Sequence, residues 1–484
     1  MTTYTEYDLS TSFSNGATVD WGNKSLWSTG TVPTNDPTAL VVFQAMTNAD
    51  GSAKSYNVDI ACGESFSICT LDMAGSDLTV AGKLTLQTGV NVISDTAEVI
   101  MAGGTINAGD LHLAGTPSVH GIVGTGTITA SDYLYIQSSI ISSTTANSNT
   151  GGSCWNICNP CGGSNSATLT LSGAELVNSG LLQANSGTIL LVNFTDFTNF
   201  SAGILSGGSY EANGGTLELH TTGVITTDAA DIVLNGFNCG GIDSLNAGTG
   251  KYVALQSSLT TIAAGGTLDL ESSPYVTSLS VTDQGALTVN GALASFTAPS
   301  LTIAAGGSAT LDGDTPLLND VLNVKTLINN GTITIDAGSA GADIIAATSV
   351  TGAGTIVIGS KAAAELTGSV ANIIHFTDGT GAVTLDTPGS MTGAISGFTA
   401  GDKITLEGGG GSSGLLSAVL SFFGLGGSSS AVTDSYSGTS TAGILTIHEG
   451  SSTLKLAFDG NYTASNFSVT SDSHGIEIVG VTHI

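Results

Sequence analysis

Short runs in which apolar and polar residues alternate recur along much of this chain, and each run follows a glycine. Between residues 259 and 358 these glycines are Gly266, Gly285, Gly307, Gly331 and Gly354. Alternation with a period of two predicts β-strands with one buried face. The glycines follow one another at steps of 19, 22, 24 and 23 residues, so the strands belong to an internal repeat.

The same step occurs earlier in the chain, where Gly82, Gly104 and Gly126 are spaced by 22 residues. This period is too short for a propeller blade, and no helical pattern fills the gaps. The repeat therefore predicts an all-β fold, a parallel β-solenoid whose repeats pair with the repeats before and after them. About 310 residues in such repeats correspond to roughly 14 coils. An array of antiparallel β-sandwich domains is the alternative, since it also combines alternating strands with glycine-rich turns.

The residue types of the repeat fit a thin stacked core. Leu, Ile, Val and Ala are expected to point inward, while Thr and Ser point outward. Glycine is expected at the corners because it adopts a positive φ there. Aromatic residues make up only 6% of the chain, so small side chains must fill the core.

Three regions follow from this pattern. Residues 1–60 are expected to be an irregular N-terminal extension and cap, in which Trp21 and Trp27 cover the end of the core; stacking of these rings on a sugar is the alternative. The solenoid is expected over residues 61–406, interrupted by a cysteine-bearing insertion at 142–166. Residues 407–484 are expected to form a β-rich C-terminal cap with an apolar insert.

The charge of the chain limits its partners. There are 38 acidic residues against eight lysines and no arginine, which gives a net charge of −30. Nucleic acid is excluded as a partner because phosphate binding depends on basic clusters. No run of 18 apolar residues predicts a membrane span. No cofactor is expected beyond weak binding of extracellular calcium by the acidic residues.

Six cysteines are candidates for disulfides, because an even number is typical of secreted chains. A Cys62–Cys69 bridge would close a short loop, and a bridge to Cys239 would tie the insertion to a later repeat. A zinc site built from Cys154, Cys158, Cys161 and Cys239 is the alternative, although their spacing is not a standard zinc-knuckle pattern. The six are Cys62, Cys69, Cys154, Cys158, Cys161 and Cys239.

The chain carries little that predicts catalysis. Solenoid pectate lyases use arginine, which is absent, and glycoside hydrolases need paired carboxylates on adjacent repeats. The histidines are scattered and form no metal-ligating pair by spacing. We therefore do not expect an enzyme; a polysaccharide-processing activity is the weakest alternative. Its only candidate acids are Asp269, Asp312, Asp314 and Asp336.

Three segments carry family resemblances. The phrase that begins at Trp21 and ends at Pro33 resembles the openings of bacterial secreted β-solenoid proteins of the autotransporter-passenger and adhesin type. Residues 393–406 and 458–472 resemble the tails of proteins exported by type I secretion. These resemblances imply a bacterial protein located outside the cell or on its surface, without a Sec signal peptide. The glycine-rich calcium nonapeptides of the type I group are absent.

These features predict a secreted structural protein that assembles with itself into extracellular filaments or into a surface or biofilm matrix layer. The ends of a solenoid present bare strands, and an extended N-terminal segment is suited to adding a strand to a neighbouring copy. A monomeric adhesin or carbohydrate-binding rod, with a cell-surface or matrix polysaccharide as its partner, is the alternative. The candidate assembly residues are Thr2, Thr3, Tyr4, Tyr7, Leu415, Leu416, Phe422 and Phe423.

Overall fold

The structure, a computed structural model, divides into two compact units, and each is described here by itself. Unit 1 comprises Met1–Thr226 and Ala230–Leu255, and unit 2 comprises Thr227–Ala229 and Gln256–Ile484. The described residues are 5–10, 13–44, 46–47, 53–54, 56–74, 76–87, 90–94, 97–114, 120–144, 167–236, 240–313, 319–336, 342–407, 432–449, 452–472 and 475–481.

The described part of the chain is all-β and contains no α-helix, only four short 3₁₀ turns. The elements up to the end of unit 1 are β1 (Thr5–Asp8), β2 (Thr18–Asp20), η1 (Lys24–Leu26), β3 (Asp36–Phe43), β4 (Met46–Thr47), β5 (Ala53–Lys54), β6 (Asn57–Ile60), β7 (Ser65–Met73), β8 (Asp77–Val80), β9 (Lys83–Leu86), β10 (Val90–Ser94), β11 (Val99–Ala114), β12 (His120–Gln137), β13 (Ile140–Ser143), β14 (Thr168–Asn178), β15 (Leu181–Asn185), β16 (Ile189–Phe197), β17 (Phe200–Ser201), β18 (Ile204–Asn213), β19 (Thr216–Leu219), β20 (Thr227–Asn235), β21 (Gly241–Asn246), β22 (Lys251–Ala254) and η2 (Leu255–Ser257).

The remaining elements belong to unit 2. They are β23 (Thr261–Ile262), β24 (Thr267–Glu271), β25 (Pro274–Val276), β26 (Val281–Asp283), β27 (Ala286–Asn290), β28 (Ser295–Ile303), β29 (Ser308–Asp312), β30 (Val321–Asn329), β31 (Thr332–Ile335), β32 (Asp343–Thr351), β33 (Thr355–Ile358), β34 (Ala363–Leu366), β35 (Ser369–Val370), β36 (Ile373–Phe376), β37 (Ala382–Leu385), η3 (Pro388–Ser390), β38 (Ala394–Ser396), β39 (Lys403–Leu406), β40 (Val432–Gly438), β41 (Ala442–Glu449), β42 (Ser452–Asp459), η4 (Ala464–Asn466), β43 (Phe467–Asp472) and β44 (Gly475–Gly480).

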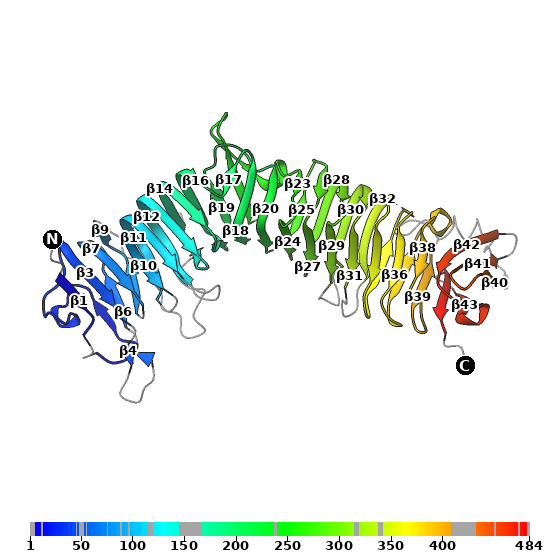
Figure 1. Cartoon of the computed structure of the whole chain (residues 1–484), viewed down its shortest axis with the longest axis horizontal. Helices are drawn as coiled ribbons and strands as arrows, with labels where there is room; N and C mark the ends of the chain where they lie inside the picture. Colours follow the sequence, from blue (N-terminus) through cyan, green and yellow to red (C-terminus); the bar gives the residue numbers. More distant parts are fainter. Residues whose placement is uncertain are drawn as a thin grey trace. The chain divides into compact units, whose positions relative to one another are not determined.

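The glycine-headed strands of unit 2 pair in parallel and in chain order. β24 pairs with β27, β27 with β29, β29 with β31 and β31 with β33. Figure 1 shows these strands side by side. The prediction that each repeat hydrogen-bonds to its neighbours is therefore confirmed for these strands, and the antiparallel sandwich alternative is wrong for them.

Unit 1 has the same arrangement. β9, β11, β12, β14 and β16 pair in parallel, one after another. The register places Leu84 opposite Ile106, which lies opposite Ile128. All three side chains are buried. Equivalent residues of successive repeats thus stack into columns.

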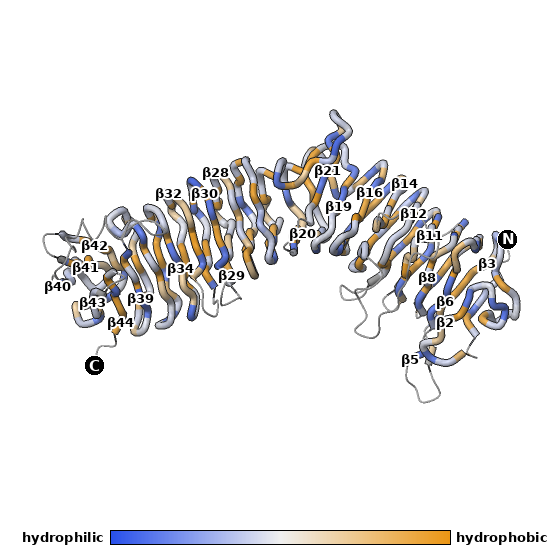
Figure 2. The backbone as a smooth tube through the Cα atoms, turned by 180° about the vertical axis from the view of Figure 1, so that it is seen from behind, coloured by the Kyte–Doolittle hydropathy of each residue, from blue (hydrophilic) through white to orange (hydrophobic). Residues whose placement is uncertain are grey.

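Inward and outward positions alternate along each strand. β31 alternates half-buried Thr332 and Thr334 with fully buried Ile333 and Ile335. Figure 2 shows the same alternation as orange and blue bands along the tube. Burial of one apolar column beside the next supplies the hydrophobic stabilisation of each unit.

The glycines that precede the repeat strands of unit 2, from Gly266 to Gly354, form a glycine column. Glycine is required at Gly307 and Gly331 for a reason other than the turn expected. Gly307 and Gly331 do not have a positive φ; positive φ belongs to the preceding residue of each Gly-Gly pair, such as Gly265 (85°) and Gly306 (93°). A Cβ on Gly331 would collide with the backbone carbonyl oxygens of Gly307 and Ala304. Gly307 and Gly331 therefore permit close backbone approach between repeats, and Gly265 and Gly306 make the turn where a Gly-Gly pair is present.

Inward amides replace apolar side chains at several turns. The backbone N–H of Asn178 donates to the side-chain oxygen of Asn199 (2.7 Å). The side-chain NH₂ of Asn199 donates in return to the backbone carbonyl of Asn178 (2.7 Å). In unit 2 the Asn372 amide donates to the carbonyls of Asn329 (3.0 Å) and Gly354 (2.9 Å). Each amide satisfies backbone groups that the turns leave without a strand partner.

The N-terminal region differs from the irregular segment expected over residues 1–60. β3 pairs in parallel with β7, and β6 pairs in parallel with β8. Ala39, Val41 and Phe43 of β3 point inward and are fully buried. The stacked strands therefore begin well before residue 61. The expected insertion also starts later than Ser142, because Ser142 and Ser143 belong to β13, and residues 145–166 lie outside the described residues.

Replacing Gly331 by alanine should destabilise unit 2 by about 3 kcal/mol, because a neighbouring backbone must move to admit the methyl group. Gly306→Ala is the matched control: its Cβ would meet nothing, and only the positive φ costs about 1 kcal/mol. Urea unfolding followed by circular dichroism measures both. An equal loss in the two variants would contradict the close-approach explanation.

Candidate functional site

The N-terminal edge of unit 1 is the first candidate site. β1 pairs in parallel with β3, with Thr5 opposite Ala39 and Asp8 opposite Val42. β2 pairs in parallel with β6. Within the described residues neither β1 nor β2 pairs with a second strand. The edge of β1 away from β3 is covered at Asp8 by Ser28 and beyond it by an isolated antiparallel bridge between Leu9 and Trp27, so the part that a further strand can extend is the start of β1.

The backbone of β1 shows which of its groups face this open edge. Asp8 donates its N–H to the Ser28 hydroxyl (3.2 Å) and accepts the Ser28 N–H (2.8 Å). Alternate residues of a strand direct their backbone groups to opposite edges. Glu6, two residues before Asp8, therefore directs its N–H and carbonyl to the side away from β3.

The aromatic residues near this edge are buried. Trp21 and Trp27 are 0% and 2% exposed, with ring centroids 4.9 Å apart. Tyr7, a predicted assembly residue, is also buried and meets Trp27 edge-on at 6.4 Å. The indole rings are thus unavailable for stacking on a sugar, and Tyr7 anchors β1 within its own chain.

The other predicted assembly residues are not placed by the structure. Thr2, Thr3 and Tyr4 lie outside the described residues. The same holds for Leu415, Leu416, Phe422 and Phe423 of the apolar insert. Their part in assembly stays a prediction.

The cysteines give a partial result. Cys62 lies in the turn between β6 and β7, and Cys69 is buried within β7. No disulfide joins Cys62 to Cys69, so the short loop expected between them is not closed in this way; Cys62 is itself disulfide-bonded. Cys154, Cys158, Cys161 and Cys239 lie outside the described residues, and pairing or zinc binding by them stays a prediction.

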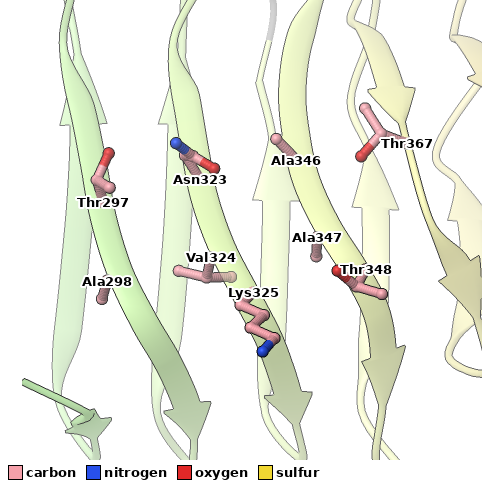
Figure 3. Close-up of a pocket in the computed structure, with 9 residues that line it drawn as sticks. All are labelled: Thr297, Ala298, Asn323, Val324, Lys325, Ala346, Ala347, Thr348 and Thr367. Carbon is pink, nitrogen blue, oxygen red and sulfur yellow. The ribbon is translucent and has the colours of Figure 1, made fainter. Parts of the chain in front are cut away.

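A shallow open groove crosses β28, β30 and β32 of unit 2. Figure 3 shows Lys325 as its one charged side chain, with Asn323 on the same strand. The groove offers hydroxyls, an amide and an ammonium but no carboxylate pair for acid–base hydrolysis. The other lining residues are Thr297, Ala298, Val324, Ala346, Ala347, Thr348 and Thr367.

The candidate carboxylates of unit 2 are only partly brought together. Asp336 donates its N–H to the Leu311 carbonyl (2.9 Å), which places it on the repeat next to Asp312. Asp269 lies apart from them on β24, and Asp314 is outside the described residues. Among the residues with described positions, no three His, Cys, Asp or Glu side chains lie close enough to hold a metal ion.

One half-buried and two buried carboxyl groups have a raised pKa. Burial, helped by the negative charge of Asp77, raises the pKa of Glu98 to about 7. Burial likewise raises the pKa of Asp283 and Asp343 to about 6. These groups are therefore protonated more readily in the folded chain than in the unfolded chain.

The structure also brings together an outward group that the sequence reasoning missed. His112 of β11 contacts Tyr133 and Tyr135 of β12, with centroid distances of 5.9 and 5.7 Å. His112 was one of the scattered histidines. Aligning the repeats would have revealed the group, because residues 110–112, 133–135 and 175–177 all have leucine at their centre.

Comparison with protein-family models, curated proteins and solved structures found no match for this chain. In the described part of the chain, no helix is long and apolar enough to cross a membrane.

The raised pKa values predict that mild acid stabilises the fold. A carboxyl whose folded-state pKa is raised contributes stability at low pH that is lost as pH rises from its unfolded value toward its folded value. Glu98→Gln should therefore stabilise unit 1 by about 1 to 2 kcal/mol at pH 8 and change little near pH 4. Urea unfolding at the two pH values measures this.

The matched control is Asp132→Asn, which removes an exposed carboxylate from the same unit. It should change the free energy of unfolding by less than about 0.5 kcal/mol at either pH. A Glu98→Gln effect of the same size at both pH values would show that the titration of Glu98 does not contribute.

Proposed function

We propose that this chain is a secreted bacterial structural protein that assembles with itself into extracellular filaments or into a surface or biofilm matrix layer. In this proposal the parallel strands wind as a β-solenoid of about 14 coils. The in-register parallel pairing in both units supports the winding. The extracellular location rests on the resemblance of residues 393–406 to type I-secreted proteins.

The observation that carries the proposal is the open edge of β1. β1 already adds to the stacked strands in parallel and leaves the backbone of Glu6 directed outward. Parallel pairing is the same interaction that joins each repeat to the next, so a strand from another copy can continue it. The partner is therefore a second copy of this chain.

The C-terminal end of unit 2 supports assembly that uses the N-terminal edge and not the C-terminal end. β39 is covered by antiparallel β44, and β38 pairs with β42, the first strand of a meander that continues through β41 to β40. We propose that these antiparallel strands cap the solenoid. The buried tryptophans would cap the core at the N-terminal end, leaving backbone edges for assembly.

Negative charge near the N-terminal edge should make this assembly depend on pH and salt. Asp20 of β2 lies directly opposite Asp59 of β6. Burial and the negative charges of Asp20 and Glu64 raise the pKa of Asp59. Two copies meeting at this edge would bring further carboxylates together, so assembly is expected to be favoured by mild acid and by salt.

A role as a monomeric adhesin or carbohydrate-binding protein is the second candidate. The outward ring group of His112, Tyr133 and Tyr135 specifically favours it, because aromatic rings are rare in this chain and these three are half-buried rather than in the core. The two roles are compatible within one matrix protein.

Glu6→Pro should abolish assembly while leaving the monomer folded. Proline removes the outward N–H of residue 6 and places its ring at the edge, whereas the backbone groups of Thr5 and Tyr7 face β3. Wild-type protein should form fibres or sheets in negative-stain electron microscopy as concentration rises, more at pH 5 than at pH 8.

Glu6→Ala is the matched control, because it removes the same side chain but keeps the N–H. It should assemble at least as well as the wild type. Isolated particles of the wild type at every concentration would overturn the proposal, and so would equal assembly of the proline and alanine variants.

A further inference from the structure

The outward face of β11, β12 and β14 in unit 1 combines aromatic rings and carboxylates in two adjacent columns. In the first column Asp110 lies opposite Tyr133, and Tyr133 lies opposite Glu175. In the second column His112 lies opposite Tyr135, which lies opposite Val177. We call Asp110, His112, Tyr133, Tyr135 and Glu175 the tyrosine strip.

The side chains of the strip point away from the core. They alternate with Leu111, Leu134 and Leu176, which are buried and point inward. All members of the strip are half-buried rather than exposed. They therefore form a continuous surface held in register by the strands beneath it.

The rings of the strip pack against one another. Tyr133 and Tyr135 are stacked, with centroids 6.0 Å apart and an interplanar angle of 19°. His112 meets Tyr135 edge-on at an interplanar angle of 60°. This mutual packing fixes the rings before any ligand arrives, which lowers the entropy lost on binding.

The surroundings of the rings are negatively charged. Asp110 and Glu175 flank Tyr133 on both sides, and Asp196 continues the column beyond Glu175. Burial, together with the negative charge of Glu175, raises the pKa of the Tyr133 hydroxyl. None of the eight lysines belongs to the strip, so the local charge matches a cationic partner and repels an anionic one.

We propose that the tyrosine strip binds a polymer of amino sugars that carry free amino groups. The apolar face of a pyranose ring packs on a tyrosine ring, and the ammonium group pairs with Glu175 or Asp110 and with the ring faces. A neutral glycan would use only the rings, and a cationic peptide would lack the flat sugar face. The strip spans three strands, about 10 Å, which accommodates about two sugar units.

This inference names the ligand of the second candidate function, carbohydrate binding, and rests on that function, but it does not require self-assembly. It concerns a face of the strands rather than their edges, so a monomer is sufficient for binding. The competing explanation is that the rings only strengthen the pairing of β11 with β12. That role would affect unfolding but would give no preference among ligands.

The test is isothermal titration calorimetry of the full chain at pH 6, at concentrations where light scattering shows a monomer. The ligands are a glucosamine hexamer, an N-acetylglucosamine hexamer and hexalysine. We expect the glucosamine hexamer to bind at least tenfold more tightly than the other two, with an affinity that falls as salt is added. Equal binding of the acetylated hexamer or of hexalysine, or no binding of the glucosamine hexamer, would overturn the proposal.

Variants separate binding from stability. The Tyr133→Ala/Tyr135→Ala double variant should weaken binding more than tenfold, and Glu175→Gln should weaken it about fivefold and reduce its salt dependence. The double Tyr→Phe variant keeps the rings and should bind within about threefold of the wild type.

Tyr252→Ala is the matched control, since Tyr252 also lies near carboxylates, those of Glu218 and Asp243, but outside the strip. It should bind like the wild type. Circular dichroism verifies that each variant is folded. Unchanged binding in the folded double alanine variant, or an equal loss in Tyr252→Ala, would assign the rings a structural role only.

Discussion

Parallel backbone pairing between equivalent residues of successive repeats is the interaction on which this structure depends. It requires the backbones of neighbouring repeats to approach closely at the same point in every turn, and the glycine column from Gly266 to Gly354 makes this approach feasible. Once that spacing is set, the inward side chains stack on copies of their own position. Small apolar residues can then fill the core, which explains how a chain so poor in aromatic residues folds.

The repeats were predictable because their signal is local and recurrent. Glycine followed by an alternating strand fixed both the strand positions in unit 2 and their parallel order. The role of Gly307 and Gly331 was not predictable in detail, since a glycine that turns the chain and one that admits a neighbouring carbonyl look identical in sequence. The strands before residue 61 were missed because β3 and β6 lack the heading glycine of the repeat, although the alternation of Ala39, Val41 and Phe43 was present.

The candidate surfaces depend on the register between strands. The sequence alone did not predict which residues of different repeats become neighbours. His112 and Tyr135 are 23 residues apart and become neighbours only when the two repeats are aligned exactly. A shift by one residue would place one of them in the core. Tyr7 shows the converse: its position near the N-terminus suggested an exposed contact, but the parallel pairing of β1 with β3 turns it inward against Trp27.

The alternation of inward and outward residues has a consequence for how such a chain can evolve. A substitution at an outward position alters surface chemistry at one point of a regular lattice and leaves the packing beneath it unchanged. An outward column can therefore combine rings and acids over an unchanged core, as Asp110, Tyr133 and Glu175 do. Inward positions are more restricted. Each inward side chain packs against the equivalent side chains of the repeats before and after it, so a substitution in one repeat limits which residues fit in the next.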